Sequence, residues 1–168
     1  MPSTERNIIP AVCLALGGLA IAAAITTSVF SSAIVTVGFT TAASPQPELP
    51  TREITVNDHR VTVEVADDED EQERGLSFRS GMDRDRGMLF VYPNASRQRF
   101  WMYGMHFPLD IIFIRDGRVI SIAAGVPAPM SGVPAVVISA DYADTVLELN
   151  AGVAKELGIV AGSDVLQE

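Results

Sequence analysis

The side chains best suited to chemistry in this chain concentrate between Arg97 and Asp110. If residues 97–103 form a strand, successive side chains point to opposite faces. One face then carries two guanidinium groups and two aromatic rings: Arg97, Arg99, Trp101 and Tyr103. The opposite face carries Gln98, Phe100 and Met102. The first row could hold an anion or a sugar ring by charge-assisted hydrogen bonds and stacking. The competing interpretation makes the aromatic rings core and the arginines surface.

Asp110 precedes an apolar stretch, so a buried Asp110 would need a partner. Arg79, Arg99 or backbone amides are the candidates, and the carboxylate would then tie down the loop from Gly104 to Pro108. The candidate ligand-binding residues are Arg79, Arg99, Trp101 and Asp110.

A catalytic interpretation pairs Asp110 with His106 as acid and base. The two residues are four apart, but Pro108 lies between them and disfavours a shared helical face. They could still meet across a turn. An enzyme that uses this pair would be hydrolase-like.

The sequence lacks the residue patterns of thiol, metal, serine-hydrolase and nucleotide-binding sites. The one cysteine, Cys13, lies in an apolar segment, so the rest of the chain has no disulfide, cysteine nucleophile or thiolate metal site. His59 and His106 are not spaced as metal ligands, and the acidic run at residues 67–70 lacks the geometry of a calcium loop. No GxSxG, GxGxxG or P-loop motif occurs. We therefore expect no metal and no cofactor.

The net charge is carried by the C-terminal part of the chain. Of 21 acidic and 12 basic residues, only Glu5 and Arg6 precede residue 48, which leaves 20 acids and 11 bases from Glu48 onward. This acidic domain would repel phosphate backbones and anionic lipid headgroups, which argues against nucleic acid as a partner.

The N-terminal part has no charged residue between Asn7 and Pro47. About 20 apolar residues span the hydrocarbon core of a membrane as a helix. Residues 1–43 are therefore predicted to hold one transmembrane helix, over Ile8 to Phe30. A cleaved signal peptide is the alternative, since small residues suited to cleavage occur at 22–24 and 41–43.

The charges that flank this segment set its expected orientation. Arg6 and the terminal amine place the N-terminus inside, so the C-terminal domain would be extracytoplasmic, either held at the membrane or secreted after cleavage. The proline-rich residues 44–51 form an extended spacer in this interpretation, and residues 52–168 form the folded domain.

The folded domain shows strand periodicity over most of its length. Alternating apolar residues at 54–56 and 61–65 flank Asn57 and Asp58, and two apolar runs flank Asp116 and Gly117, so each pair predicts a hairpin. Further strands are predicted at residues 88–92, with a turn at Pro93 and Asn94, and at residues 136–139 and 146–149.

Two short helices complete the pattern. The acidic run from Asp67 to Glu73 suits the start of one helix, and residues 151–157 suit another, capped by Asn150 and ended by Gly158. The expected class is α+β, a mostly antiparallel curled sheet or partial β-barrel with two short helices, preceded by one transmembrane helix.

Five ordered blocks resemble the family called domain of unknown function 192. They are Gly75 to Arg79, Gly87 to Pro93, Phe100 to Met102, Pro108 to Ile114 and Val146 to Gly152. The resemblance covers residues 52–167 and implies a small β-rich domain, often behind a signal peptide or membrane helix, with no established activity. The chain departs from the family pattern at residues 103–105, where a lysine is common, and at residues 127–134, where cysteines are common.

Three functions fit these observations. The first is a noncatalytic extracytoplasmic module that binds a small polar ligand or an envelope protein and reaches the membrane through its N-terminal helix. The second is the enzyme that uses Asp110 and His106. The third is a structural envelope domain without a ligand.

Overall fold

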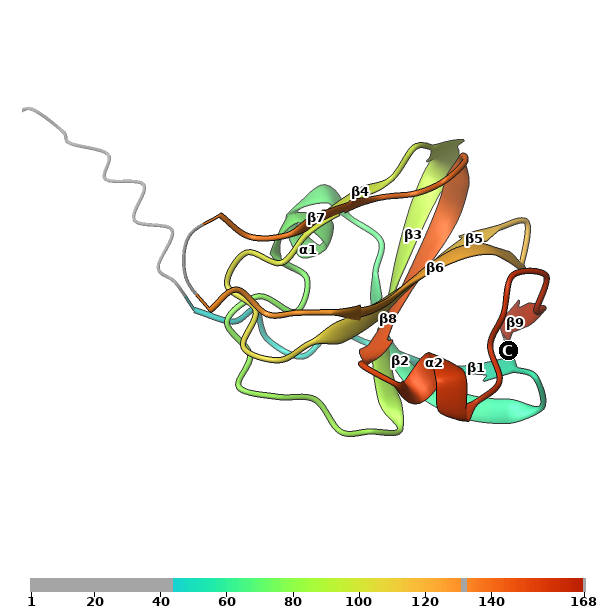
Figure 1. The fold of residues 1–168 in the computed structure, drawn as a ribbon, viewed down its shortest axis with the longest axis horizontal. Coiled ribbons are helices and arrows are strands. Elements are labelled where there is room, and N and C mark those ends of the chain that lie inside the picture. Colours follow the sequence, from blue (N-terminus) through green and yellow to red (C-terminus); the bar gives the residue numbers. More distant parts are fainter. Residues whose placement is uncertain (1–43, 131–132, 168) are drawn as a thin grey trace, which may run out of the picture. The chain divides into compact units, whose positions relative to one another are not determined.

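The computed structural model describes residues 44–130 and 133–167, which belong to one compact unit (Figure 1). The predicted membrane segment, residues 1–43, lies outside the described residues. Within those two ranges, no helix is both long enough and apolar enough to cross a membrane.

Strands dominate the described part of the chain, with two short helices. The strands are β1 (Thr51–Val56), β2 (His59–Ala66), β3 (Arg86–Ser96), β4 (Arg99–Trp101), β5 (Leu109–Arg115), β6 (Arg118–Val126), β7 (Val136–Ile138), β8 (Ala143–Asn150) and β9 (Val165–Gln167). The helices are α1 (Glu69–Arg74) and α2 (Val153–Glu156). Seven strands form one sheet in the order β6-β5-β8-β3-β2-β1-β9, and β4 pairs with β7.

Tight turns form at both dipeptides that predicted hairpins. Asn57 and Asp58 join β1 to β2 with φ of 48° and 64°, and Asp116 and Gly117 join β5 to β6 with φ of 49° and 73°. A two-residue turn with positive φ at both positions matches the twist of paired strands. Both hairpin predictions are confirmed.

One strand pair departs from the antiparallel pattern, because β2 and β3 run parallel. A parallel pair needs a crossover connection, and here residues 67–85 supply it, with α1 inside. Asp68 caps α1 by accepting a hydrogen bond from the Glu71 amide at 2.8 Å, and Gly75 ends the helix. The helix was predicted, whereas the parallel pairing was not.

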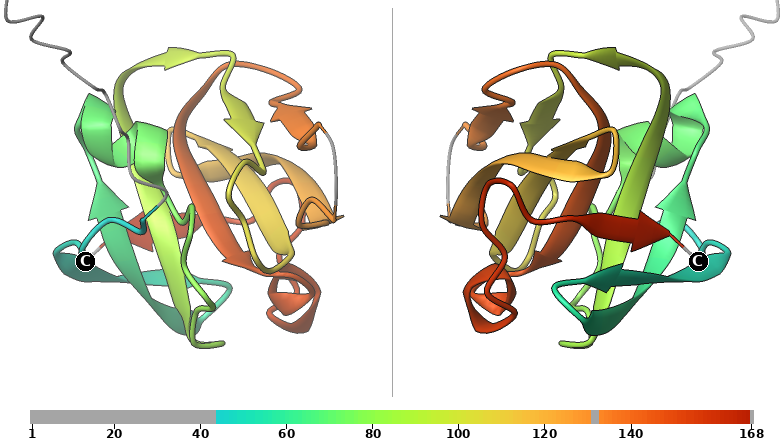
Figure 2. Two further views of the ribbon diagram at one scale, coloured as in Figure 1. Left: turned by 90° about the vertical axis from the view of Figure 1, so that its left-hand side faces the viewer. Right: turned by 90° about the vertical axis from the view of Figure 1, so that its right-hand side faces the viewer.

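The sheet curls until its two edge regions meet at one end (Figure 2). A β-bridge joins Arg118 at the start of β6 to Asp164, the residue before β9. Beside it, the Val119 amide donates to the Ser163 carbonyl at 2.9 Å. The prediction of a curled sheet or partial barrel with two short helices is therefore confirmed.

An apolar cluster packs on each face of the curled sheet. Leu147 and Leu149 of β8 belong to the first cluster, and Val146 belongs to the second. The second is covered by the β4–β7 pair, whose Phe100 ring lies 4.9 Å from Phe90 and 6.1 Å from Phe113, measured between centroids. Both arrangements are edge-on, the favoured geometry for aromatic pairs.

The region around β4 differs in detail from the prediction. The turn expected at Pro93 and Asn94 is wrong, because β3 continues to Ser96 and the pairing with β8 is interrupted between Val91 and Ser96. An interrupted ladder tolerates proline, which has no amide hydrogen to donate. β4 is shorter than the predicted strand at residues 97–103, yet burial alternates along this stretch as predicted.

The second helix also begins differently from the prediction. α2 follows Gly152, which has a left-handed backbone and offers no side-chain cap. The Asn150 side chain instead donates to the carbonyls of Met82 and Asp83, each at 3.0 Å. The predicted Asn150 cap is therefore wrong, because its amide joins β8 to a distant loop.

The proline-rich segment before β1 contacts the domain. The buried Gln46 side chain donates to the Gly75 carbonyl at 2.9 Å, and the Leu49 amide donates to the Glu64 carboxylate at 2.7 Å. Part of the expected spacer, residues 44–51, thus packs on the end of α1 and on β2.

Candidate ligand-binding site

A cavity of about 60 Å³ lies between α1 with its following turn and β4, and β3 and β8 form its floor. Its lining combines aromatic rings with a few polar groups. The lining residues are Gln72, Glu73, Arg74, Gly75, Leu76, Ser77, Phe90, Tyr92, Arg99, Phe100, Trp101, Met105 and Glu148. The walls are therefore mixed, with aromatic side chains beside charged and amide groups that could orient a small polar molecule.

Glu148 is the unusual residue of this cavity. It lies on β8, a central strand, where it pairs with Met88 of β3 and Ile111 of β5. Because directly opposed residues share a face, its side chain projects from the face that carries the second apolar cluster. Only 5% of Glu148 is exposed.

The Glu148 carboxyl group has no hydrogen-bond or ion-pair partner among residues 44–130 and 133–167. Burial raises its pKa to about 8, because an apolar environment disfavours the charged form. At neutral pH the group is therefore mainly protonated and can both donate and accept a hydrogen bond. Its oxygens line the cavity, where water or a bound molecule can hydrogen-bond with them.

Tyr92 lies beside this carboxyl group on the cavity wall. Burial raises the pKa of the Tyr92 phenol, and the negative charge of ionised Glu148 raises it further. The phenol therefore stays neutral at physiological pH and presents a hydroxyl group and an aromatic face.

β4 contributes Arg99 and Trp101 to the mouth of the cavity. Both also line an adjoining hollow of about 270 Å³, which is otherwise lined by Gln72 and Glu73. Trp101 is 52% exposed and its ring lies 6.2 Å from that of Tyr103, measured between centroids. The Arg99 guanidinium forms no ion pair with any carboxylate in the described ranges. Neither Trp101 nor Tyr103 is a core residue.

Gln72 is held in place at the junction of the two hollows. Its side-chain nitrogen donates to the Val91 carbonyl at 2.8 Å and to the Ala66 carbonyl at 3.3 Å. The nitrogen is thus used within the protein, which orients the amide oxygen as an acceptor.

Arg79 lies in a different environment from Arg99. Its guanidinium forms a bidentate pair with Glu64, at 2.5 and 2.8 Å, and both side chains are largely buried. Burial alone would raise the pKa of Glu64, but the Arg79 hydrogen bonds and the Leu49 amide lower it below its usual value. Arg79 therefore has a structural partner and does not line the cavity.

Asp110 is also placed away from the cavity. One carboxylate oxygen accepts from the Gly125 amide at 2.7 Å and the other from the Ala154 amide at 3.0 Å. Backbone amides are thus its partners, as one interpretation expected, but they belong to β6 and α2 rather than to the loop from Gly104 to Pro108. His106 is exposed and forms no hydrogen bond with Asp110 in the described ranges.

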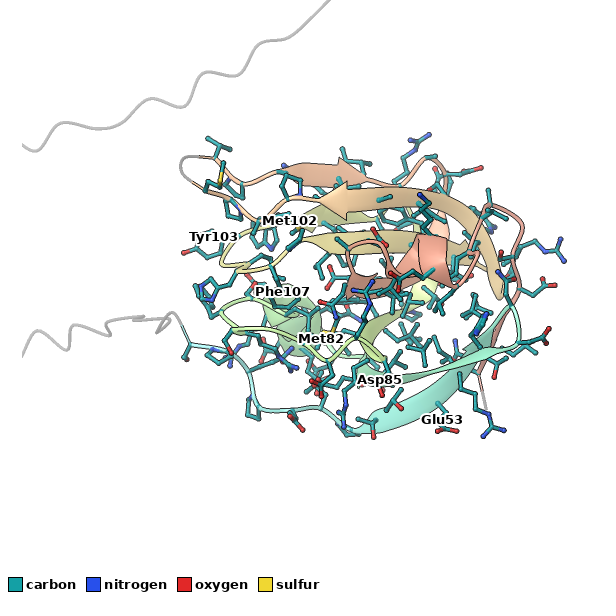
Figure 3. The ribbon with its side chains drawn as sticks, turned by 60° about the horizontal axis from the view of Figure 1, so that its bottom comes forward. Glu53, Met82, Asp85, Met102, Tyr103 and Phe107 are labelled. Atoms are coloured by element: carbon teal, nitrogen blue, oxygen red, sulfur yellow. The ribbon has the colours of Figure 1, made fainter. Side chains whose placement is uncertain are left out.

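Two of the four predicted ligand-binding residues lie at the cavity and two do not. The structure brings Arg99 and Trp101 together at its mouth and leaves Arg79 and Asp110 elsewhere. Tyr103, whose ring centroid is 6.2 Å from that of Trp101, lies at the end of the domain opposite Glu53 (Figure 3). No cluster of three or more potential metal-ligating side chains occurs within residues 44–130 and 133–167.

Glu148 was not predicted as a site residue. The residues that share its face of the strand are Asp144, Val146 and Asn150, so only Val146 is apolar there. Such a face reads as exposed to solvent, and the alternation therefore gives no clear signal that Glu148 is buried.

Two solved structures are similar to this domain. A protein from Sinorhizobium meliloti 1021, described as a candidate transcription regulator, is 32% identical, with a TM-score of 0.66 over 73% of this chain and 97% of that chain. A protein of unknown function from Novosphingobium aromaticivorans DSM 12444 is 35% identical, with a TM-score of 0.64 over 74% of this chain and 90% of that chain. Among curated proteins, no sequence matches this one. Residues 52–166, more than half of the chain, match the model of the family described as Uncharacterized ACR, DUF192, so the protein belongs to the DUF192 family.

Proposed function

We propose that this domain is a noncatalytic binding module that holds a small polar ligand in the cavity above Glu148. The observation that supports the proposal is the buried Glu148 carboxyl group, which has no partner in the described protein and faces a cavity with aromatic walls. Arg99, Trp101 and Gln72 surround the opening and offer a cation, a stacking surface and an acceptor.

Binding is favoured over catalysis because the cavity lacks an activated nucleophile. The Ser77 hydroxyl group on its wall donates to the Tyr103 carbonyl at 2.9 Å and has no base beside it in the described part of the chain. The alternative enzyme would use Asp110, whose two carboxylate oxygens each accept from a backbone amide, and this favours a structural role for Asp110.

The setting that we propose is the outer side of a membrane. The largely uncharged residues 1–43 would anchor the protein or be cleaved as a signal, and an envelope protein would be a second partner. The Sinorhizobium protein is described as a candidate transcription regulator, but a nucleic-acid partner is not part of this proposal because the net charge of −9 would repel phosphate backbones. Recovery of the uncleaved chain from cell extracts without detergent would contradict the anchor.

Trp101 provides a direct readout of binding, because it is the one tryptophan of the chain and lines the site. We expect a panel of small amines, carboxylates and sugars to contain compounds that change Trp101 fluorescence and raise the melting temperature of the full chain. Glu148→Gln should weaken binding of such a compound about tenfold or more.

Glu53→Gln is the matched control, because Glu53 is an exposed residue of β1 at the other end of the domain (Figure 3). It should bind like the parent chain. Equal binding by Glu148→Gln, or no response to any compound in the panel, would contradict the proposed function.

A further inference from the structure

We propose that the ligand of this cavity is an organic ammonium ion that also carries an anionic group, with the ammonium at Glu148 and the anion at Arg99. This inference rests on the proposed function and names the chemical class of the ligand. It follows from the order of groups between the floor of the cavity and its mouth.

The floor suits a cation. Glu148 supplies a carboxyl group without a protein partner, and Phe90, Tyr92 and Phe100 supply aromatic rings around it. Aromatic faces attract ammonium groups, and a carboxylate beside them adds a charge-assisted hydrogen bond. An anionic group at this depth would instead face an acidic side chain and the negative faces of the rings.

The size of the cavity limits what can reach Glu148. A volume of about 60 Å³ holds about two water molecules or a group of similar size, such as a primary or methylated ammonium. The rest of the ligand would lie in the adjoining hollow of about 270 Å³, against the Trp101 ring.

The mouth suits an anion. Arg99 has no carboxylate partner in the described ranges, and a guanidinium binds carboxylate or phosphate oxygens through two parallel hydrogen bonds. Glu73 and Arg74 of α1 also line the cavity, and their opposite charges offset each other. Glu73 also lines the adjoining hollow beside Arg99, whereas Arg74 lines the cavity alone, so the two linings together carry two guanidinium groups and the single carboxylate of Glu73 around the opening.

A bare metal ion fits this site less well. A divalent cation takes several oxygen ligands, and no cluster of three or more potential ligating side chains occurs in the described part of the chain. An organic ammonium needs one carboxylate and an aromatic surround.

Binding of an ammonium group has a proton signature. Free Glu148 is mainly protonated at neutral pH, since burial raises its pKa to about 8. An ammonium beside it favours the carboxylate form, so the carboxyl group releases its proton to solvent and forms an ion pair with the ligand. The charged or titratable groups that also line the cavity are Glu73, Arg74, Tyr92 and Arg99.

The test is calorimetric titration of the full chain near pH 7, in two buffers that differ in ionisation enthalpy. The probes are glycine, β-alanine, γ-aminobutyrate and glycine betaine, with methylamine and acetate as single-charge controls. We expect at least one amino carboxylate to bind with release of up to about one proton, and methylamine and acetate to bind about tenfold more weakly or worse.

Two variants test which residue binds the ammonium group and which binds the anionic group. Glu148→Gln should abolish the proton release and weaken binding, whereas Arg99→Gln should reduce affinity for the amino carboxylate toward that of methylamine and preserve the proton release. Thermal melts establish that both variants fold. Glu53→Gln should match the parent chain.

The outcomes separate this inference from the proposed function. If a sugar, a simple carboxylate or a divalent metal ion binds with a Trp101 response and no amino carboxylate does, the ammonium inference fails and the binding module stands. Binding of an amino carboxylate without proton release, or proton release that persists in Glu148→Gln, also overturns the inference. Absence of a response to every probe overturns both.

Discussion

Glu148 links the protonation of the cavity to the stability of the fold. Its carboxyl group is buried among apolar side chains, so the folded state holds a proton that the unfolded chain would lose near the ordinary value of 4.5. Because the pKa of Glu148 in the fold is raised to about 8, its contribution to stability is fully present below pH 4.5 and is lost as the pH rises to about 8.

This linkage predicts that the free energy of unfolding depends on pH. The free energy of unfolding of the parent chain should fall by roughly 3–5 kcal/mol between about pH 5 and pH 8, and Glu148→Gln should show no such fall. Denaturant titrations at several pH values measure it. Glu64, whose pKa is lowered, acts in the opposite direction below its usual value of 4.5, so it does not mask this window. A flat profile for the parent chain between pH 5 and 8 would contradict the prediction.

Some individual residues of the candidate site could be predicted from the sequence. The alternation of residues 97–103 predicted which side chains are exposed, including Arg99 and Trp101. It did not reveal Glu148, because one acidic residue in a strand ordinarily marks a solvent-facing position. That this position is covered follows from the β4–β7 pair and α1, which come from distant parts of the chain.

Among the elements, one side chain of β5 contacts both α2 and the end of β6. Asp110, which is 1% exposed, accepts from the Gly125 and Ala154 amides with separate oxygens. The bond to Ala154 is buried and the bond to Gly125 is partly buried, so the carboxylate satisfies at least one backbone donor that water cannot reach. It links α2 to β5 and bridges the irregularity in the β5–β6 pairing between Leu109 and Ile111.

Replacing Asp110 tests this role. Asp110→Asn turns one acceptor into a donor that faces a backbone amide, so the free energy of unfolding should fall by about 2–3 kcal/mol. Asp116→Asn is a matched control in the exposed β5–β6 turn, where asparagine tolerates positive φ, and its effect should be within about 0.5 kcal/mol. Urea unfolding measures both. Unchanged stability in Asp110→Asn would remove the structural role.

Local signals explain which elements were predicted correctly. The Asn57–Asp58 and Asp116–Gly117 turns and the α1 cap at Asp68 depend on neighbours in the sequence. The Asn150 contact and the parallel pairing of β2 with β3 depend on residues far along the chain. Sequence periodicity carries no information about such partners.

At the scale of the whole domain, closure of the curled sheet depends on the C-terminal residues. β9 pairs with β1, and the residues before it bridge to the start of β6. Val165 is buried in the first apolar cluster. The resemblance in sequence indicated the family and the strand-rich class, but β9 is too short to show a periodic pattern.

Ending the chain at Gly162 should open this closure. The β1 edge would lose its partner and the cluster would lose Val165, so we expect a melting temperature lower by several degrees and some self-association through the free edge. Thermal melts and size-exclusion chromatography measure the two effects. Leu166→Ser, at an exposed position of β9, is the control that should change neither. A shortened chain with the parent melting temperature would show that closure contributes little.

Substitutions in α1, the helix of the β2–β3 crossover, would alter the lining of the cavity without changing the apolar core. It lines the cavity with Gln72, Glu73 and Arg74, yet none of its residues is buried. Substitutions at Glu73 and Arg74 should therefore leave both apolar clusters intact while they alter the charge offered to a guest molecule. Under the proposed binding function, proteins built on this scaffold could differ in ligand specificity through substitutions in α1 alone.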